Sequence, residues 1–259
     1  MKPTGRLQLW IWKIRLRLRE SAFLRQAVRA ARRLAPDSRA RHLRGEVRFW
    51  KRWLVTQGLH WPDDFAARFD PDAPIQEHVA RLVDQCPHDR VEILDVGAGP
   101  VTVLGKVHPA KQLSITATDV LGDEYAGLLA ELGVTPLVPT LNAAAENLRH
   151  RLGERQFDIV HAQNALDHSA DPFAALEEMF ALTRPGGFIV LLHEENEGKN
   201  ELYWALHKWD FTCVEGNFII AGPGPNGTPR DVTRMFSGRA SVECSIDAGE
   251  ILVTMRKVS

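Results

Sequence analysis

The chain has 259 residues, enough for one α/β domain with an extension or for two small domains. Its hydrophobic content of 44% and charged content of 25% are those of an ordinary globular protein. The three cysteines, Cys86, Cys213 and Cys244, are odd in number and lack CxxC spacing. This pattern predicts reduced thiols and a cytoplasmic location, and it argues against a disulfide framework and a cysteine zinc site.

The net charge of −1 hides an uneven distribution. Residues 1–55 hold sixteen Lys or Arg and have a net charge of +13, so the remainder carries −14. A basic arm before an acidic body favours contact with something anionic, either another molecule such as the inner face of a membrane or the body of a second copy. Because no RNA-binding motif or aromatic–basic platform is visible, nucleic acid is disfavoured as the partner.

The N-terminal segment reads as helical. Residues 7–31 place apolar side chains at helical spacing on two sides, but charges interrupt every apolar run, so the segment is neither a signal peptide nor a membrane span. An interfacial helix and a helix packed between two protein surfaces both stay open. A second helix is expected after Ser38 and a short one after Trp61, with a linker over residues 70–74. Residues 1–74 are therefore predicted to form a helical basic extension and residues 75–259 a second domain.

The segment over residues 91–99 is the most informative part of the chain. After a helix expected over residues 75–85, a mostly apolar run contains Asp95 and is stopped by Gly97 and Gly99, as in a buried parallel strand that enters a tight turn. Glycine is needed where a backbone turns sharply or approaches a ligand closely. A second apolar run over residues 113–118 ends in Asp119, where a carboxylate can hold the sugar hydroxyls of a nucleotide-type cofactor.

These residues resemble the class I S-adenosylmethionine-dependent methyltransferases, including their type-11-like domain. The family pattern is an acid, one residue, Gly-x-Gly, and a second acid that ends strand two; here these are Asp95, Gly97, Gly99 and Asp119. The third glycine often seen in that family is Val101 here. A dinucleotide-binding loop is the alternative, but it requires a glycine where Thr102 stands.

Later segments extend the resemblance to residues 75–193, with a weaker tail to residue 257. Residues 157–162 resemble the family's fourth strand, residues 173–183 read as a helix, and the Arg-Pro-Gly-Gly turn of residues 184–187 precedes a strand over residues 188–192. A helical stretch is then expected through about Trp209, followed by strands over residues 217–221, 241–246 and 251–256. The resemblance implies a doubly wound, mostly parallel seven-stranded α/β sheet that ends in an antiparallel hairpin.

The resemblance also implies S-adenosyl-L-methionine as the cofactor. Asp119 would take its ribose hydroxyls, and Asp95 would order the turn or meet the amino-acid part through water. The adenine contact is open, because alanine stands where aspartate is usual, leaving Glu146 or the backbone of Ala145. The complete set of expected cofactor residues is Asp95, Gly97, Ala98, Gly99, Asp119, Val120, Ala145, Glu146 and Gln163.

Methyl transfer to a hydroxyl needs a base, and two histidines follow strands four and five. His168 is the preferred base, with Asp167 or Glu194 as its orienter; His193 is the other candidate, and His168 acting only as a loop-holding residue is the structural alternative. A metal-assisted variant would use His193, Glu194, Asp167 and His168, but nothing in the spacing demands it. No metal is therefore expected.

The acceptor is expected to lie near the segment after strand five, where Glu194, Asn196, Trp204 and His207 are the candidate contacts. Tryptophan faces beside carboxylates and amides suit a sugar. Three functions stay open: O-methylation of a small polar molecule or a glycan, methylation of RNA or protein through the basic arm, and a non-catalytic subunit that docks on a partner enzyme. The first is favoured, and a homo-oligomer is compatible with it.

Overall fold

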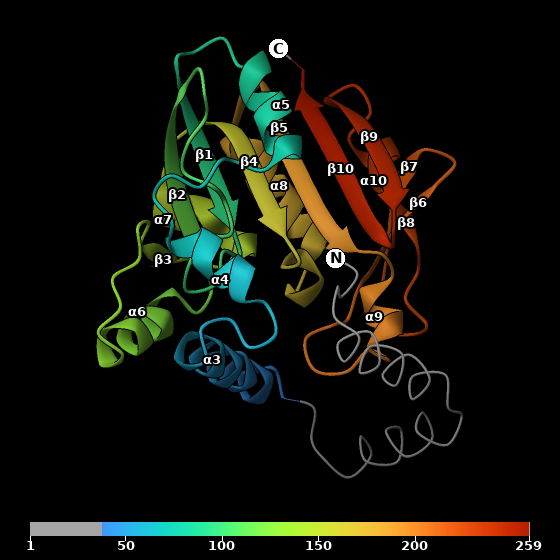
Figure 1. Ribbon diagram of the computed structural model, residues 1–259. Helices are drawn as coiled ribbons and strands as arrows, with labels where there is room; N and C mark the ends of the chain where they lie inside the picture. Colours follow the sequence, from blue (N-terminus) through green and yellow to red (C-terminus); the bar gives the residue numbers. More distant parts are fainter. Residues whose placement is uncertain (1–37, 259) are drawn as a thin grey trace.

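The computed structural model describes residues 38–258, which form an α/β structure around a seven-stranded sheet (Figure 1). The helix expected over residues 7–31 lies outside this range. The strand order is β3-β2-β1-β4-β5-β10-β9. The strands are β1 (Arg90–Val96), β2 (Gln112–Asp119), β3 (Thr140–Asn142), β4 (Phe157–Gln163), β5 (Thr183–Glu194), β9 (Ala240–Asp247) and β10 (Glu250–Lys257).

Strands β1 to β5 run parallel, and β10 pairs antiparallel with both β5 and β9. The predicted doubly wound sheet with a C-terminal hairpin is therefore confirmed. Apolar runs make central strands because both faces are covered: six of the seven residues of β4 are buried. The chain order reverses around β1, which has β2 on one side and β4 on the other, and this is where open α/β sheets form a crevice at the carboxyl ends of their strands.

Helices cover both faces of the sheet. The helices are α3 (Arg39–Val55), α4 (Pro62–Phe69), α5 (Glu77–Gln85), α6 (Gly122–Glu131), α7 (Leu148–Leu152), α8 (Pro172–Leu182), α9 (Glu197–Asn200) and α10 (Val232–Met235). Two 3-10 helices are η1 (Ala145–Asn147) and η2 (Leu166–His168). Val79 and Val83 of α5 join one buried cluster, whereas Leu176 and Met179 of α8 join another. Within residues 38–258 no helix has the length and apolar character needed to cross a bilayer.

Helix α3 lies at the end of the sheet toward which the arrows of β1, β4 and β5 point (Figure 1). Its Trp53 is buried in a third apolar cluster with Leu128 and Leu129 of α6. An ion pair between Lys51 Nζ and Glu131 Oε1, 2.6 Å apart, joins the same two helices at the surface. The part of the predicted extension that the structure describes is thus packed against the sheet domain.

The predicted helix up to Trp209 is wrong beyond α9. Leu202, Tyr203 and Ala205 have φ values of 56°, 55° and 53°, which no α-helix accommodates. Asp210 accounts for the compact fold of this segment, because its carboxylate accepts hydrogen bonds from Lys199 N at 2.7 Å and from Tyr203 Oη at 2.6 Å. The apolar residues Leu202, Leu206 and Trp209 are spaced by four and three as in a helix, but they are buried or half-buried in an irregular segment.

The Arg-Pro-Gly-Gly segment is not a separate turn, because β5 begins at Thr183 and includes it, with an irregular register against β4. Arg184 Nη1 donates to the buried Asp158 Oδ2 at 2.5 Å, and that oxygen also accepts from Glu92 N at 2.8 Å. A Cβ on Gly187 would come within 2.8 Å of the Asp158 carbonyl oxygen, so glycine is required where the two strands approach.

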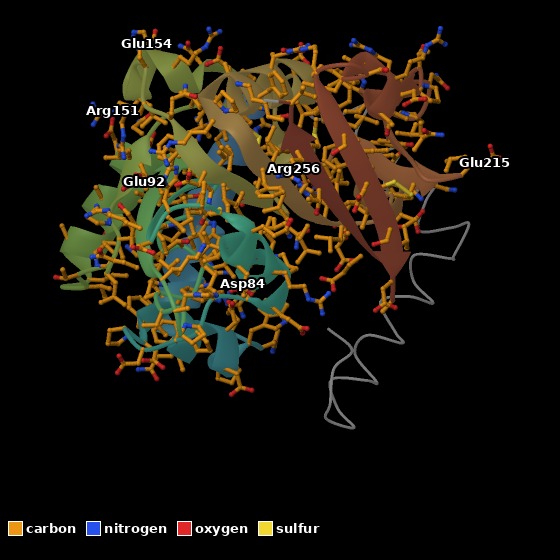
Figure 2. All side chains as sticks on the ribbon, turned by 90° about the horizontal axis from the view of Figure 1, so that it is seen from above. Asp84, Glu92, Arg151, Glu154, Glu215 and Arg256 are labelled. Carbon is orange, nitrogen blue, oxygen red and sulfur yellow. A yellow bond between two sulfur atoms is a disulfide. The ribbon has the colours of Figure 1, made fainter. Side chains whose placement is uncertain are left out.

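A small second sheet follows α9, with the order β6-β7-β8 and the strands β6 (Asp210–Val214), β7 (Asn217–Ala221) and β8 (Arg230–Asp231). The prediction of reduced thiols is wrong for two cysteines: Cys213 of β6 and Cys244 of β9 form a disulfide, with Cα atoms 6.1 Å apart. It lies on the side of the molecule that carries Glu215 (Figure 2). Sequence spacing missed the pair because strand packing, not CxxC proximity, brings these residues together. Only Cys86 remains a free thiol.

Candidate active site

The turn after β1 adopts the backbone that its glycines allow. Gly97 has φ 71° and Gly99 has φ 66°, in the left-handed region where side chains are strained. The amides of Gly97 and Ala98 donate to the Thr118 carbonyl at 2.8 and 3.0 Å, which fixes the turn against the end of β2. A Cβ on Gly97 would lie 2.3 Å from Cβ of Ala165, so the turn also fits closely against the loop after β4.

Asp119, at the end of β2, is held by the same turn. Its Oδ2 accepts from Gly99 N at 3.1 Å and its Oδ1 from Leu121 N at 2.9 Å. Burial raises the pKa of Asp119 to about 6; the two amide hydrogen bonds limit the rise, the charge of Glu46 adds to it, and His168 opposes it. Each oxygen keeps a second lone pair, so the carboxylate can also accept from the hydroxyls of a ligand.

A cavity of about 700 Å³, part of it open to solvent, lies over this turn. It is bordered by the β1 turn, the ends of β2 and β4, η1, η2 and helix α3. The lining residues are Arg39, Leu43, Glu46, Trp50, Val96, Gly97, Gly99, Asp119, Val120, Leu121, Tyr125, Ala143, Ala145, Glu146, Asn164, Ala165, Leu166, His168, Ser169 and Leu206.

Helix α3 closes one side of this cavity. Trp50 lies against the turn, since a Cβ on Gly99 would come 2.8 Å from its Cζ2 atom. Arg39, at the start of the helix, donates from Nη1 to the His168 carbonyl at 2.9 Å. The described part of the N-terminal extension therefore supplies a wall of the site, from Arg39 at one end to Trp50 at the other.

Asp95 lies beneath the turn and does not line the cavity. It is 1% exposed; Thr102 Oγ1 donates to its Oδ2 at 2.5 Å, and its Oδ1 lies 2.7 Å from His161 Nδ1. Of the two roles expected for this residue, ordering of the turn is the one that its contacts match. Thr102, which replaces the glycine of a dinucleotide-binding loop, is thereby explained: its hydroxyl holds the Asp95 carboxylate.

The other expected cofactor residues divide into two groups. Val120, Ala145 and Glu146 line the cavity, whereas Ala98 and Gln163 do not. Glu146 also supports the loop after β4, because its Oε1 accepts from Ala170 N at 2.5 Å and from Asp171 N at 3.2 Å.

A cluster of histidines around one buried carboxylate lies at the edge of the cavity. Asp167 is 4% exposed, and its Oδ2 lies 2.9 Å from His207 Nδ1 and 3.4 Å from His168 Nε2. The two histidine nitrogens are 3.1 Å apart. On the other side, Asp167 Oδ1 lies 3.8 Å from His193 Nδ1.

Charge and burial act in opposite directions on this cluster. Burial disfavours the ionised form of Asp167, but His168, the hydrogen bond from His207 and His193 outweigh it and hold the pKa of Asp167 well below its usual range. Burial likewise disfavours imidazolium at His207, yet Asp167 raises the pKa of that histidine. For His193 burial prevails and lowers the pKa to about 4. The site therefore combines an ionised buried carboxylate with a neutral His193.

The two predicted base candidates differ in position. His168 lines the cavity and is half-buried, whereas His193 is 2% exposed, packs 4.8 Å from the Phe211 ring and does not line the cavity. His207, expected to contact substrate, joins the cluster. Glu194, Asn196 and Trp204 do not line the cavity.

Several lining residues were not singled out as site residues in the sequence. Arg39, Glu46 and Trp50 come from α3, which has no family motif, and Tyr125 comes from the first half of α6. The periodicity that predicts α3 includes Trp50 but does not say what its apolar face covers. The contribution of this helix depends on its packing across the sheet, which local sequence does not encode.

The residues present fit S-adenosylmethionine. Two glycines border the cavity, and the Asp119 carboxylate faces it with free acceptor capacity, as a ribose requires. Glu146 and the α3 residues add polar and aromatic groups to the cavity lining.

Residues 94–191 match the family described as "Methyltransferase domain". No curated protein matches the chain. Among solved structures, the chain is similar to a S-adenosylmethionine-dependent methyltransferase from Clostridium acetobutylicum, with a TM-score of 0.44 and 10% identity over 70% of this chain and 89% of that one.

Two further solved structures are similar in the same way. The DhpI-SAM-HEP complex has a TM-score of 0.46 and 16% identity, over 86% of this chain and 99% of that one. CalS10, an amino pentose methyltransferase from Micromonospora echinaspora, has a TM-score of 0.42 and 15% identity, over 70% and 89%. The chain thus contains a segment, from Leu94 in β1 to Leu191 in β5, that matches a methyltransferase domain and holds both the glycine turn and Asp119.

Proposed function

We propose that this protein is a class I S-adenosylmethionine-dependent methyltransferase and that it transfers the methyl group to a hydroxyl oxygen of a small polar molecule or of a sugar, free or within a glycan. One observation carries the proposal: His168 lines the cofactor cavity and contacts a buried carboxylate and a second histidine. A hydroxyl oxygen attacks well only as its proton leaves, so a group that promotes this loss belongs beside the methyl donor. The proposed base is a histidine of this cluster, with His168 as its member at the cavity.

S-adenosylmethionine supplies, when bound, a methyl group that its positive sulfur already activates. The task of the chain is to orient the acceptor oxygen in line with that methyl group and to exclude water. Orientation of this kind can contribute about 7–11 kcal/mol. Helix α3 fits this task, because its Trp50 covers the cavity beside Gly99 and its Arg39 donates a hydrogen bond to the His168 carbonyl.

The polar lining supports a hydroxylated acceptor. Arg39, Glu46 and Asn164 border the same cavity as His168, and they offer both donors and acceptors of hydrogen bonds. An apolar acceptor would displace water from these polar groups without offering them hydrogen bonds in return, at the cost of their desolvation.

The test is transfer of labelled methyl from S-adenosylmethionine into a fractionated cell extract. We expect label in small-molecule or glycan fractions, as an alkali-stable methyl ether. Label in RNA or protein would contradict the proposal and favour the corresponding alternative. His168→Ala should lower the transfer rate while cofactor affinity, measured by calorimetry, is kept, whereas the matched control His150→Ala, an exposed histidine on α7, should leave both unchanged.

We further propose that residues 75–259 form the methyltransferase domain and that residues 1–74 are an extension whose second half covers the site. The basic arm would bring the protein to an anionic surface, such as the cytoplasmic face of a membrane, or to a second copy. Its charge of +13 over residues 1–55 supports this role.

A further inference from the structure

Three polar atoms beside the cofactor cavity form a compact triangle. His207 Nδ1 and Asp167 Oδ2 are 2.9 Å apart, the nitrogens of His207 and His168 are 3.1 Å apart, and His168 Nε2 is 3.4 Å from the same carboxylate oxygen. The three side chains come from η2 and from the irregular segment before β6, so two separate parts of the chain converge on this point.

Hydrogen bonds account for two sides of this triangle, since a proton on His207 Nδ1 can be shared between Asp167 Oδ2 and His168 Nε2, but they leave the 3.4 Å contact between His168 and Asp167 without a bond. Each ring nitrogen either carries a proton and donates, or has a lone pair and accepts, and an ionised carboxylate only accepts. If both nitrogens donate to Asp167, their protons oppose each other across 3.1 Å. If one nitrogen accepts, its lone pair faces the lone pairs of the carboxylate. No placement of protons therefore makes all three contacts attractive.

A cation makes all three contacts favourable at once. Metal–nitrogen and metal–oxygen bonds of about 2.1 Å place neighbouring ligand atoms about 3.0 Å apart in octahedral geometry and about 3.4 Å apart in tetrahedral geometry. The three observed separations of 2.9, 3.1 and 3.4 Å span this range. These three residues can offer ligand atoms that all lie within 4.8 Å of one another.

We infer that Asp167, His168 and His207 form a binding site for a divalent transition-metal cation. Two imidazoles and one carboxylate suit Zn²⁺, Fe²⁺, Co²⁺ or Mn²⁺ better than Mg²⁺ or Ca²⁺, which prefer oxygen ligands. A second observation concerns the same carboxylate: Asp167 Oδ1, 3.8 Å from His193 Nδ1, is buried without a hydrogen bond, so the carboxylate keeps acceptor capacity that a cation can use. Glu197 Oε1, 3.9 Å from His207 Nδ1, adds a nearby carboxylate on the same side.

The position of this cation site beside the cofactor cavity suggests that the cation activates the acceptor hydroxyl, an inference that rests on the proposed function. His168 and Leu206 both line the cofactor cavity, so positions on the cation not taken by protein can face the acceptor. An acceptor hydroxyl bound there becomes more acidic and releases its proton to solvent. The oxygen then bonds to the methyl carbon while the carbon–sulfur bond breaks and its electron pair stays on sulfur. When the cation is bound, it activates the hydroxyl in place of His168, whose Nε2 lone pair then binds the cation.

The test is a titration of the full-length, chelator-treated protein with Co²⁺, followed by visible absorption, and with Zn²⁺, followed by calorimetry. We expect one cation per chain. His207→Ala and His168→Ala should each weaken binding at least tenfold, and the milder Asp167→Asn should do so with the fold kept, as near-ultraviolet circular dichroism checks. His150→Ala is the matched control and should bind as the wild type does.

The outcomes separate this inference from the proposed function. Absence of saturable binding, or binding unaffected by His168→Ala and His207→Ala, overturns the cation site; methyl transfer to a hydroxyl by the chelated protein then leaves the proposed function in place. Saturable binding that these variants abolish supports the site. If methyl label in that case enters only protein or RNA, the proposed function fails and the cation loses its assigned role.

Discussion

The indole of Trp50 lies so close to Gly99 that a Cβ on the glycine would come 2.8 Å from Cζ2. Helix α3 and the turn after β1 thus meet at the cofactor cavity, and both residues line it. Trp50 also packs against the Trp53 ring at 5.3 Å and the Tyr125 ring at 6.4 Å, between ring centroids. The described part of the N-terminal extension in this way borders the cavity.

Replacing Trp50 should weaken cofactor binding. Trp50→Ala removes an aromatic contact worth about 1 kcal/mol, so we expect about fivefold lower affinity for S-adenosylmethionine by calorimetry. Trp61→Ala is the matched control, because Trp61 is 47% exposed and does not line the cavity. Equal affinities for the two variants would show that α3 does not contribute to the cofactor site.

Gly97 should not tolerate a side chain. Gly97→Ala places a methyl group 2.3 Å from Cβ of Ala165 on a backbone with φ 71°, and we expect a loss of about 1–3 kcal/mol in the free energy of unfolding, measured with urea. Adding Ala165→Gly should recover the part due to the clash and leave the part due to φ. Gly127→Ala is the control, because a Cβ there meets nothing within 4 Å and should not destabilise α6.

Cofactor affinity should depend on pH through Asp119. Its pKa of about 6 means that the carboxylate, which accepts from ribose hydroxyls, is ionised above pH 6 and lost below it. Affinity should therefore fall about fourfold between pH 7.5 and pH 5.5 if only the ionised form binds. Asp119→Asn, which cannot ionise, should remove this pH dependence. A pH dependence of the same size in Asp119→Asn would contradict its assignment to this carboxylate.

The basic arm should carry the contact with anionic surfaces. Deletion of residues 1–37 removes ten Lys or Arg but keeps α3 and hence the cavity. Basic residues near an anionic bilayer contribute about 1 kcal/mol each, so co-sedimentation with phosphatidylglycerol vesicles, or else self-association in sedimentation velocity, should fall sharply. Neutral vesicles and high salt serve as controls. If both properties survive the deletion, the arm has another role.

The sheet was predictable because each strand carries its own signal. The apolar runs that end in Asp95-Val96-Gly97 and in Asp119 predict β1, β2 and the crevice between them, and these are where the structure has them. Turn chemistry at Ala248 and Gly249 likewise predicts the hairpin of β9 and β10. Such features are local, because burial on both faces and turn geometry each require particular residue types at consecutive positions.

The sequence predictions that were wrong concern features that depend on contacts between distant segments. The segment from Leu202 to Trp209 has helical spacing, but Asp210 folds it into turns through hydrogen bonds that spacing cannot reveal. The Cys213–Cys244 disulfide joins strands 31 residues apart. The meeting of His207 with Asp167 is of the same kind: from the sequence, Asp167 is paired with His168, whereas His207 is placed only among the acceptor contacts.

The most direct measurement is calorimetric titration of S-adenosylmethionine into the wild type, Asp119→Ala and the neighbouring control Asp123→Ala, which alters an exposed aspartate outside the cavity. Hydrogen bonds to a charged group contribute about 1.5–3 kcal/mol, so Asp119→Ala should lower the affinity at least tenfold while Asp123→Ala leaves it unchanged. Wild-type affinity in Asp119→Ala, or no binding by the wild type, would contradict the assignment of this cavity to the methyl donor.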